Sequence, residues 1–411
     1  MAAIGALVVQ AALRGDITRH VREFQVVYCI ALAGYAALMA IVWRQDAALR
    51  LGDWRRWLIV CAILRAGLAF TVPSDDVFRY VWEGRIQVAG FNPFAQAPDA
   101  EALTPLHDEE WARINHPGYK TIYPPLAQMV FAALAWVHPS VGFFKACFAG
   151  LDLLTVIVLG QWCRRLGRPP HQALIYGLCP LTLTTFGIDG HLDSLMLLLL
   201  ALAGLALHGR RYYWAAGCLA GAIGAKVVAV VLLGWLAMRC WRAAVLCVLL
   251  VVGLYLPYAS AGWGLVESLF RFAGGTAFFG LLHQPVAAWF GAGAAHTIGL
   301  GLLAAAVLAS IRAGHSFERH GGIVLGTLML VSPVAHYWYL TWVLLFVAVR
   351  PRWCWLILSG SMVFYFEAEQ ARLITKLWEM PAWSWYAVYG PFVTAWVIES
   401  WTARRTSRAS A

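Results

Sequence analysis

Residues 190–207, GHLDSLMLLLLALAGLAL, decide the fold class of this chain. After Asp193 the stretch carries no charged side chain, and its length comes close to the about 20 apolar residues that cross a bilayer as a helix. Similar stretches recur along all 411 residues, of which 61% are hydrophobic and only 13% are charged. A soluble domain has about 25% charged residues, and disordered chains are poor in the aromatic side chains that make up 14% of this one. The sequence therefore predicts an all-α protein with many membrane spans.

The apolar stretches predict a polytopic protein with about 11–13 transmembrane helices, some of them shortened by snorkelling side chains. Residues 213–238 are interrupted around Lys226, so we expect two short helices that meet at a break. The run from Tyr123 to His138 is also short and is a candidate re-entrant helix. We expect 1–411 to form a single membrane domain. The other candidate spans are 24–43, 57–72, 143–163, 171–187, 190–207, 241–258, 286–311, 321–335, 336–349, 353–367 and 384–401.

Basic residues orient the predicted spans. The connections expected on the cytoplasmic side hold most of the Lys and Arg residues of this chain of net charge +10, as the positive-inside rule requires. These connections are 44–56, 164–170, 208–212, 239–242, 312–320 and 350–352, together with the C-terminal tail. The polar motifs then lie on the extracytoplasmic face, where nucleotide sugars and ATP are absent. These motifs are the 73–122 loop, residues 190–193, Lys226, His283 and His336.

The 73–122 loop holds eight of the chain's 21 acidic residues, and we expect it to fold as an extramembrane helical cap. Asp75 and Asp76 lie at its start, where an apolar helix ends. A carboxylate at this lipid–water boundary is partly desolvated, which raises its pKa and suits a general base. The alternative is that Ser74 or Asp75 caps a helix over 76–88. The two roles can coexist, because one residue can cap the helix while Asp76 faces a cleft.

Residues 74–85, SDDVFRYVWEGR, resemble the first-loop signature of membrane mannosyltransferases of the glycosyltransferase-C superfamily. The most similar family is that of the bacterial polyprenyl-phosphate-mannose-dependent α-mannosyltransferases. In related enzymes the catalytic acid is followed three and four residues later by Arg and Tyr, and Arg79 and Tyr80 therefore select Asp76 over Asp75. The similarity continues, within about 60–346, in GFNPF (90–94), INHP (114–117), TIYPPL (121–126), GHLDSL (190–195), Ala225-Lys226 and SPVAHYWY (332–339).

The resemblance implies a glycosyltransferase-C fold in the inner membrane of a bacterial cell, with the active site on the extracytoplasmic face. It implies a polyprenyl-phosphate-linked mannose as donor and a lipid-linked or cell-envelope glycan as acceptor. No nucleic-acid partner is expected, because the basic residues are spread in small groups between the apolar stretches. In the implied mechanism Asp76 takes the proton of the acceptor hydroxyl, whose oxygen displaces the polyprenyl phosphate in one inverting step. Lys226, His336 or Arg79 would stabilise the leaving phosphate. Some relatives use a divalent cation and others do not, so the need for a metal stays open.

Three further polar residues have both a functional and a structural interpretation. His191 and Asp193 start a predicted span, where they would hold the acceptor or a cation, or where Asp189 or Asp193 would cap the helix. Lys226 lies in the break between two short helices, where an ammonium group binds the donor's phosphate or snorkels to the interface.

Two histidines and two tyrosines are weaker candidates. His283 and His336 lie near aromatic residues at predicted membrane interfaces, where they would contact phosphate or sugar or serve packing alone. Tyr80 and Tyr123 lie near the Asp motif and would stack on the apolar face of a sugar, or belong to an interfacial aromatic belt.

Two other functions fit the same composition. A transporter or flippase of lipid-linked sugars also needs many spans, broken helices and buried charges. A glycan ligase or polymerase with a lipid diphosphate donor would need a similar site. The large acidic cap on one face favours the glycosyltransferase.

Overall fold

The computed structural model describes residues 1–44, 51–375 and 378–409. The chain is 79% helical, and no β-strand forms among the described residues. Isolated bridges join Phe278 and Phe279 to Val334. Arg50, one of the basic residues of the 44–56 connection, lies outside the described residues, as do the last two residues of the C-terminal tail. The prediction of an all-α polytopic membrane protein is confirmed.

The described chain divides into two compact units, and the expected single domain over 1–411 stays a prediction. The first unit comprises Met1–Gly67, Arg168–Thr184 and Ala277–Ala411, and the second comprises Leu68–Gly167 and Thr185–Thr276. Each unit is thus assembled from segments that are separated in sequence. The chain passes from the first unit to the second after Gly67 and again after Thr184, and the second of these points lies in the π-helix η5 (Leu183–Ile188).

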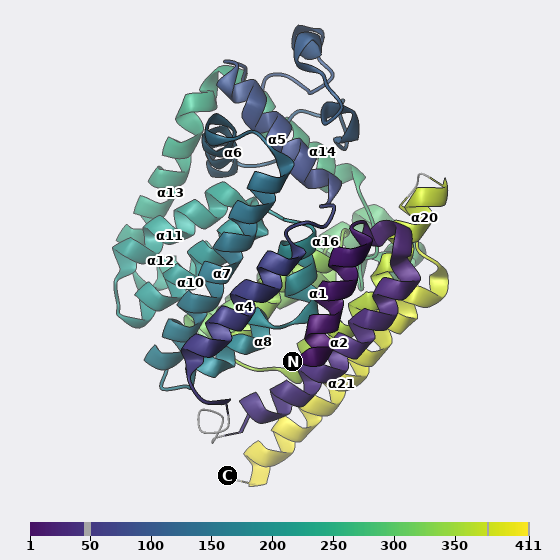
Figure 1. Ribbon diagram of the computed structural model, residues 1–411. Helices are drawn as coiled ribbons and strands as arrows, with labels where there is room; N and C mark the ends of the chain where they lie inside the picture. Colours follow the sequence, from purple (N-terminus) through teal and green to yellow (C-terminus); the bar gives the residue numbers. More distant parts are fainter. Residues whose placement is uncertain (45–50, 376–377, 410–411) are drawn as a thin grey trace. The chain divides into compact units, whose positions relative to one another are not determined.

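The second unit is built around α7, α10, α11 and α13, and neighbouring members of this series pack against each other, as α5 does against α6 (Figure 1). Ser140 caps α7 by accepting from the Phe143 N–H, and Arg164 and Arg165 complement the helix dipole at its other end. The elements of the second unit are α5 (Asp75–Val88), η2 (Glu101–Leu106), η3 (Trp111–Arg113), α6 (Pro125–Val137), α7 (Val141–Arg165), α10 (Asp193–His208), α11 (Tyr212–Ala225), η6 (Val227–Leu232), α12 (Leu233–Arg239), α13 (Trp241–Tyr255), η7 (Leu256–Ala261) and α14 (Gly264–Gly275).

In the first unit α1 packs on α2, α16 on α17, and α19 on α21. Its elements before residue 184 are α1 (Ala2–Arg14), η1 (Ile17–His20), α2 (Val21–Val42), α4 (Trp54–Leu68), η4 (Pro170–Ala173), α8 (Leu174–Gly177) and α9 (Pro180–Thr182). Those after residue 277 are α15 (His283–Phe290), α16 (Ala292–Arg312), α17 (Phe317–Val331), η8 (Tyr337–Tyr339), α18 (Leu340–Val349), α19 (Trp353–Ser361), η9 (Met362–Phe366), α20 (Glu367–Thr375) and α21 (Ala382–Ala409).

Four helical stretches among the described residues are long and apolar enough to cross a membrane: Ile17–Val42, Val141–Arg165, Trp241–Ala261 and Ala292–Arg312. Several shorter apolar helices accompany them, α6 and α10 included. Apolar side chains on the long stretches are exposed, as in Leu249, which is 62% exposed. Such side chains are compatible with lipid as their surroundings, because exposed apolar surface of this extent is unusual in water-soluble monomers.

The predicted span 171–187 is wrong. This stretch forms η4, α8, α9 and the π-helix η5, and its residues are buried. Pro180 interrupts regular helix formation, because a proline disfavours helical backbone at the residue before it and lacks an N–H donor of its own. The segment is therefore an irregular part of the protein interior.

The other broken or shortened spans follow the local sequence. The predicted span 286–311 consists of α15 and α16, which are separated at Gly291 with φ +83°. The expected break around Lys226 is confirmed, because α11 ends at Ala225 and Lys226 has extended backbone angles before η6 begins. The helix expected after Tyr123 is α6, with proline at its first position.

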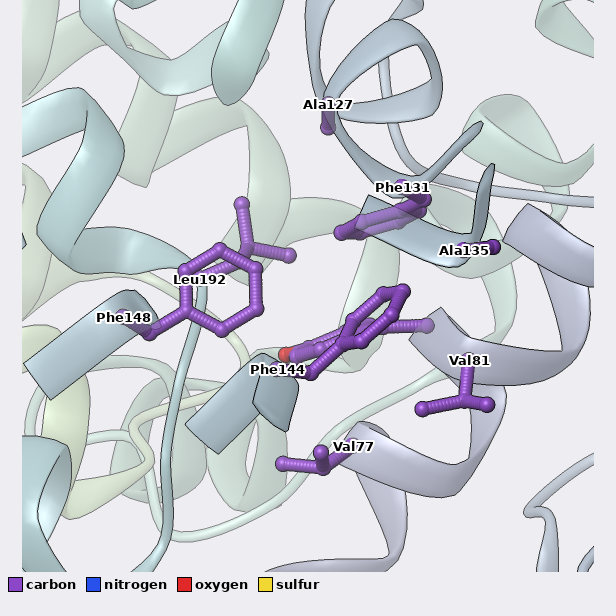
Figure 2. Packing of buried hydrophobic residues seen from close by; sticks show 9 residues of the cluster. Val77, Val81, Ala127, Phe131, Ala135, Phe144, Phe148 and Leu192 are labelled. Atoms are coloured by element: carbon purple, nitrogen blue, oxygen red, sulfur yellow. The ribbon is translucent and has the colours of Figure 1, made fainter. Parts of the chain in front are cut away.

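An apolar cluster anchors the cap helix α5 to α6 and α7 (Figure 2). Val77 and Val81 of α5 are buried in it with Phe131 of α6 and Phe144 of α7. The two backbones of α5 and α6 come close at Gly84, where an added Cβ would lie 2.4 Å from the Phe131 carbonyl oxygen. Only glycine fits this approach, which holds α5 close against α6.

Candidate active site

The neighbouring carboxylates Asp75 and Asp76 have different surroundings at the start of α5. Ser74 is the N-cap of this helix. Its Oγ accepts a hydrogen bond of 3.3 Å from the Asp76 backbone N–H and donates one of 3.3 Å to Asp75 Oδ1. The Ser74 backbone N–H donates to the Asp189 carbonyl oxygen at 3.2 Å. The capping role predicted for Ser74 is confirmed, and the Asp76 side chain contacts other segments.

Asp76 lies between an amide and an imidazole. The Asn115 side-chain amide donates to Asp76 Oδ1 at 2.6 Å, and His191 Nδ1 lies 3.5 Å from Asp76 Oδ2. The His191 side chain is only 1% exposed, whereas the Asp76 side chain is 20% exposed. Asp76 is therefore held from the protein side and still reaches solvent.

The pKa of Asp76 is lowered, which corrects the raised value expected at a lipid–water boundary. Burial alone would raise this pKa, but the hydrogen bond and charge of His191, the Asn115 hydrogen bond and the Lys226 charge together outweigh it. The pKa of His191 is raised for the reciprocal reason. Burial opposes its protonation, and the hydrogen bond and charge of Asp76 and the charges of Asp189 and Asp193 favour it more strongly.

Lys226 and Asp193 form a second ion pair beside the first. Lys226 Nζ lies 2.6 Å from Asp193 Oδ1, which joins the broken end of α11 to the first residue of α10. Asp193 is 1% exposed and Lys226 is 22% exposed. The four side chains Asp76, His191, Asp193 and Lys226 thus bring carboxylates, an imidazole and an ammonium group together where apolar helices begin or end, and we call them the charged cluster.

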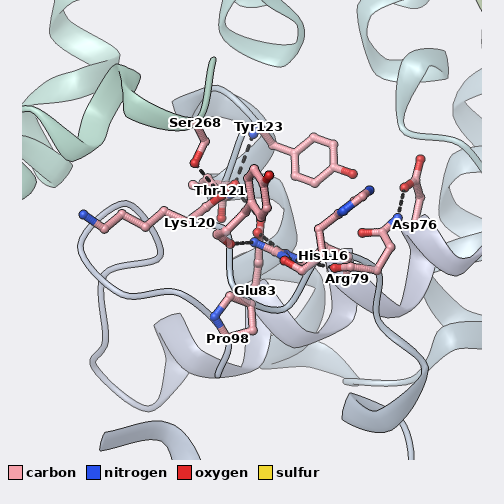
Figure 3. Close-up of polar contacts among 12 residues, drawn as sticks. Asp76, Arg79, Glu83, Pro98, His116, Lys120, Thr121, Tyr123 and Ser268 are labelled. Carbon is pink, nitrogen blue, oxygen red and sulfur yellow. Dashed lines mark hydrogen bonds and ion pairs between the residues drawn. The ribbon is translucent and has the colours of Figure 1, made fainter. Parts of the chain in front are cut away.

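Arg79, one turn into α5, is engaged by protein groups (Figure 3). Its guanidinium donates to Glu83 Oε1 at 2.6 Å and to the carbonyl oxygens of Asn115, His116 and Tyr119 at 3.2, 3.0 and 2.6 Å. The side chain is 5% exposed. Arg79 therefore fixes residues 115–119 beside Asp76, which differs from the phosphate contact expected from the sequence.

Glu83 neutralises Arg79 and is itself fully satisfied. Its Oε2 accepts hydrogen bonds from Thr121 Oγ1 at 2.8 Å and from Gln128 Nε2 at 2.5 Å. Glu83 is 1% exposed. A buried carboxylate with this set of donors ties α5, the 115–121 segment and α6 into one rigid piece (Figure 3).

Tyr80 and Tyr123 lie in the aromatic core beneath the charged cluster. The Tyr80 ring stacks on Phe131 with ring centroids 4.8 Å apart and meets Tyr123 edge-on at 5.1 Å. Tyr80 is 1% exposed, so its ring has no free face for a sugar. The stacking role expected for Tyr80 is wrong, because packing against α6 takes its face. Tyr123 is less buried and stays a candidate.

His283 and His336 belong to the first unit, whereas the charged cluster belongs to the second. His336 Nδ1 lies 2.6 Å from the Tyr365 hydroxyl, and its ring stacks on Trp338 at a centroid distance of 4.2 Å. His283 Nε2 lies 3.5 Å from His296 Nδ1. Both histidines have local partners, and their substrate contacts stay a prediction.

Two contacts near the cluster were missed by the sequence analysis. Asn115 was quoted only as part of a motif, and nothing in its spacing indicates that it meets Asp76. Lys145 of α7 is 1% exposed, and its Nζ donates to the carbonyl oxygens of Leu68 and Thr71 at 2.8 and 2.6 Å. The available signal was a lysine inside an apolar stretch, which needs carbonyl or carboxylate partners.

A metal site gains no support from the geometry. In the parts of the chain that the structure describes, no group of three or more His, Cys, Asp and Glu side chains is arranged to hold a metal ion. Asp193, one of the residues considered for a cation, contacts the Lys226 ammonium group.

A polytopic all-α protein that gathers ionisable side chains at the ends of its apolar helices has the features of an integral membrane enzyme. The family model described as alpha-(1->6)-mannopyranosyltransferase, N-terminal domain, matches residues 2–242, more than half of the chain. The chain belongs to this family and is a mannosyltransferase. The matched residues include Asn115 and the whole charged cluster, but neither His283 nor His336. No curated protein and no solved structure matches the chain.

Proposed function

We propose that this mannosyltransferase takes mannose from a polyprenyl-phosphate-linked donor and attaches it to a hydroxyl of a lipid-linked or cell-envelope glycan. The observation that carries the proposal is the Asp76 carboxylate, which is held by Asn115 and His191 and remains partly exposed where apolar helices end. A lipid-bound donor and a hydrophilic acceptor can meet at such a position. The first-loop similarity to enzymes that use this donor supports the same choice.

Asp76 acts as the general base. Its lowered pKa keeps the carboxylate ionised at neutral pH, so that it can accept the proton of an acceptor hydroxyl as that oxygen attacks. The new C–O bond forms on the face opposite the leaving phosphate, and the anomeric configuration is inverted. Asn115 and His191 position the carboxylate, because both contact its oxygens.

The polyprenyl phosphate leaves with one more negative charge than it carried in the donor. Lys226, 22% exposed at the edge of the cluster, is the cation that we assign to this phosphate. Asp193 holds the ammonium group at the end of α11. His191 and Asp193 thus support Asp76 and Lys226, in place of the direct acceptor contacts expected from the sequence.

The charged cluster is assigned to the extracytoplasmic face of a bacterial inner membrane. Lys145 near the start of α7 contacts the segment before α5, whereas Arg164 and Arg165 lie in the last turn. Basic residues favour the cytoplasmic end of a span, so α7 would run from the site toward the cytoplasm. A lipid-phosphate donor suits a face that lacks nucleotide sugars.

The direct test is an assay of the purified protein in nanodiscs. Polyprenyl-phosphate-mannose labelled in the sugar is supplied with glycolipid acceptors, and the product is analysed for a new mannosyl linkage of inverted configuration. GDP-mannose and a polyprenyl-diphosphate-linked sugar serve as the alternative donors. We expect transfer from the monophosphate donor alone.

Two results would replace the proposal. Transfer from the diphosphate donor alone would identify a ligase or polymerase. Movement of labelled lipid across the membrane of proteoliposomes, without any new linkage, would identify a flippase.

The rate of transfer should depend on the protonation of His191. Below its raised pKa the imidazolium pairs with Asp76 and lowers the basicity of that carboxylate. With saturating donor, kcat is therefore expected to rise with pH through a limb centred above the ordinary histidine value of about 6.5 and then to level off. The measurement is kcat from about pH 6 to about pH 9.

His191→Asn is the matched variant, since it keeps a polar side chain but cannot ionise. Its kcat should lack this limb, although the rate on the plateau is expected to be lower than in the wild type because Asp76 is less well positioned. A wild-type kcat that is flat over the range, or a limb that persists in His191→Asn, contradicts the role given to His191.

A further inference from the structure

A second polar region of the second unit lies at the opposite end of α7 from the charged cluster. A cavity of about 640 Å³ is lined there by residues of α7, α10 and α11 and of the connection between α10 and α11. Arg164, Arg165 and Arg211 contribute to its lining, and Leu202 and Leu205 contribute apolar walls. Its volume lies within the roughly 300–1,000 Å³ of ordinary ligand sites.

The charge of this cavity is of one sign. None of its lining residues is acidic, and the three arginines are exposed. Over the described residues, none of the three forms an ion pair with a carboxylate, which contrasts with the paired cations of the charged cluster. An anion that enters the cavity would therefore meet positive side chains, the neutral Gln161 and apolar walls, and no negative charge.

Along α7, the arginines of the cavity lie about one bilayer thickness from Lys145, which contacts the segment before α5. Lys145 contacts Thr71 near the start of α5, and Arg164 lies nineteen positions later in the same helix. At about 1.5 Å per residue this separation is about 29 Å, close to the about 30 Å of the hydrocarbon core. Trp214 lines the cavity and is 74% exposed, as is typical of aromatic side chains at a membrane interface.

The helix dipole and the positive-inside rule explain why Arg164 and Arg165 lie at the end of α7. The positive-inside rule also accounts for Arg211 in the next connection, but it does not explain why the three arginines converge on one cavity with apolar walls. Arginine binds phosphate oxygens in a bidentate manner, and leucine side chains contact acyl chains. The arrangement thus matches both parts of a phospholipid molecule.

We propose that this cavity binds an anionic phospholipid of the surrounding bilayer. The phosphate lies among Arg164, Arg165 and Arg211, and an acyl chain runs along Leu202 and Leu205. Basic pockets between membrane helices bind the head groups of anionic lipids in the same way. The site is separate from mannosyl transfer and does not depend on the donor proposed for that reaction.

The test is lipid binding to the delipidated full-length protein in detergent, measured by native mass spectrometry. Phosphatidylglycerol is titrated against phosphatidylcholine with identical acyl chains, with inorganic phosphate as a third ligand. We expect phosphatidylglycerol to bind at least tenfold more tightly than phosphatidylcholine, and inorganic phosphate at equal concentration not to displace it. The variant R164Q/R165Q/R211Q is expected to lose this preference.

Arg242→Gln is the matched control, because Arg242 is an exposed arginine at the start of α13 that does not line the cavity. It should bind phosphatidylglycerol as the wild type does. Leu205→Trp keeps all three arginines, and since it narrows the cavity it is expected to weaken lipid binding as well. If the triple variant does not purify as a monodisperse protein, the three single Arg→Gln variants are each expected to weaken binding severalfold.

Four results would overturn the proposal. The first three are equal binding of the two lipids, unchanged binding in the arginine variants, and displacement of the lipid by inorganic phosphate. The fourth is a loss of phosphatidylglycerol binding in Arg242→Gln as large as in the triple variant. The last of these would indicate attraction to surface charge in general. Mannosyl transfer is not part of this measurement, so its result is independent of the proposed donor.

Discussion

Replacing Asp76 by asparagine is expected to lower kcat for mannosyl transfer by about 10²–10⁴-fold, the usual contribution of a general base. The amide has nearly the same shape, and its oxygen can still accept the Asn115 hydrogen bond of 2.6 Å. It cannot accept the proton of an acceptor hydroxyl. The loss should therefore appear in kcat, with donor binding and folding preserved.

The measurement is single-turnover transfer in nanodiscs, with donor binding measured separately. Asp108→Asn is the control, because it removes a carboxylate of the same cap that pairs with Arg85 away from the charged cluster, and it should leave kcat nearly unchanged. Asp75→Asn tests the choice between the two neighbours. Since Asp75 contacts the capping Ser74, we expect Asp75→Asn to lower kcat less than Asp76→Asn does.

Near wild-type turnover in Asp76→Asn would refute the assignment of the base. A larger loss in Asp75→Asn than in Asp76→Asn would transfer the role to Asp75. Both variants remove one charge from the same helix turn, so a nonspecific electrostatic effect would lower kcat equally in the two.

Glu83→Ala is expected to destabilise the protein by about 3–5 kcal/mol, the usual result of leaving one partner of a buried ion pair alone. The Arg79 guanidinium, 5% exposed, would lose its carboxylate, and Thr121 and Gln128 would lose the acceptor of their hydrogen bonds. Replacement by alanine also leaves a cavity at a position that is 1% exposed.

The free energy of unfolding is measured by denaturant titration in detergent. Glu110→Ala is the matched control, because this cap glutamate is 39% exposed and lies 3.7 Å from Arg85, so its removal should change stability by no more than about 0.5 kcal/mol. Equal stability of Glu83→Ala and Glu110→Ala would show that the Arg79–Glu83 pair does not hold the cap together.

Local sequence was sufficient for the parts of the fold that local chemistry decides. The helix over 76–88 and its Ser74 cap follow from a serine and two acidic residues before an amphipathic run, and α5 begins one residue earlier than expected. The break at Lys226 follows from a charged residue in an apolar stretch. The error at 171–187 came from counting apolar residues without weighing Pro180, because a buried irregular segment and a span have similar composition.

The site was predictable only in part, since its contacts join distant segments. Asp76 was selected by the neighbouring Arg and Tyr, but the meeting of Asp76 with Asn115 across 39 positions depends on the path of the cap. The predicted direction of the Asp76 pKa shift was wrong for the same reason. Desolvation is a property of the location of Asp76, whereas His191 and Lys226 approach it only in the folded chain.

The Arg79 guanidinium holds the far end of the loop that follows α5. It binds the backbone carbonyl oxygens of Asn115, His116 and Tyr119, so the chain that leaves α5 is brought back and fastened next to Asp76. Because Arg79 binds main-chain carbonyl oxygens, these hydrogen bonds do not depend on the side chains of the loop between α5 and Asn115. Substitutions at exposed positions of the intervening turns are therefore expected to leave the geometry around Asp76 unchanged.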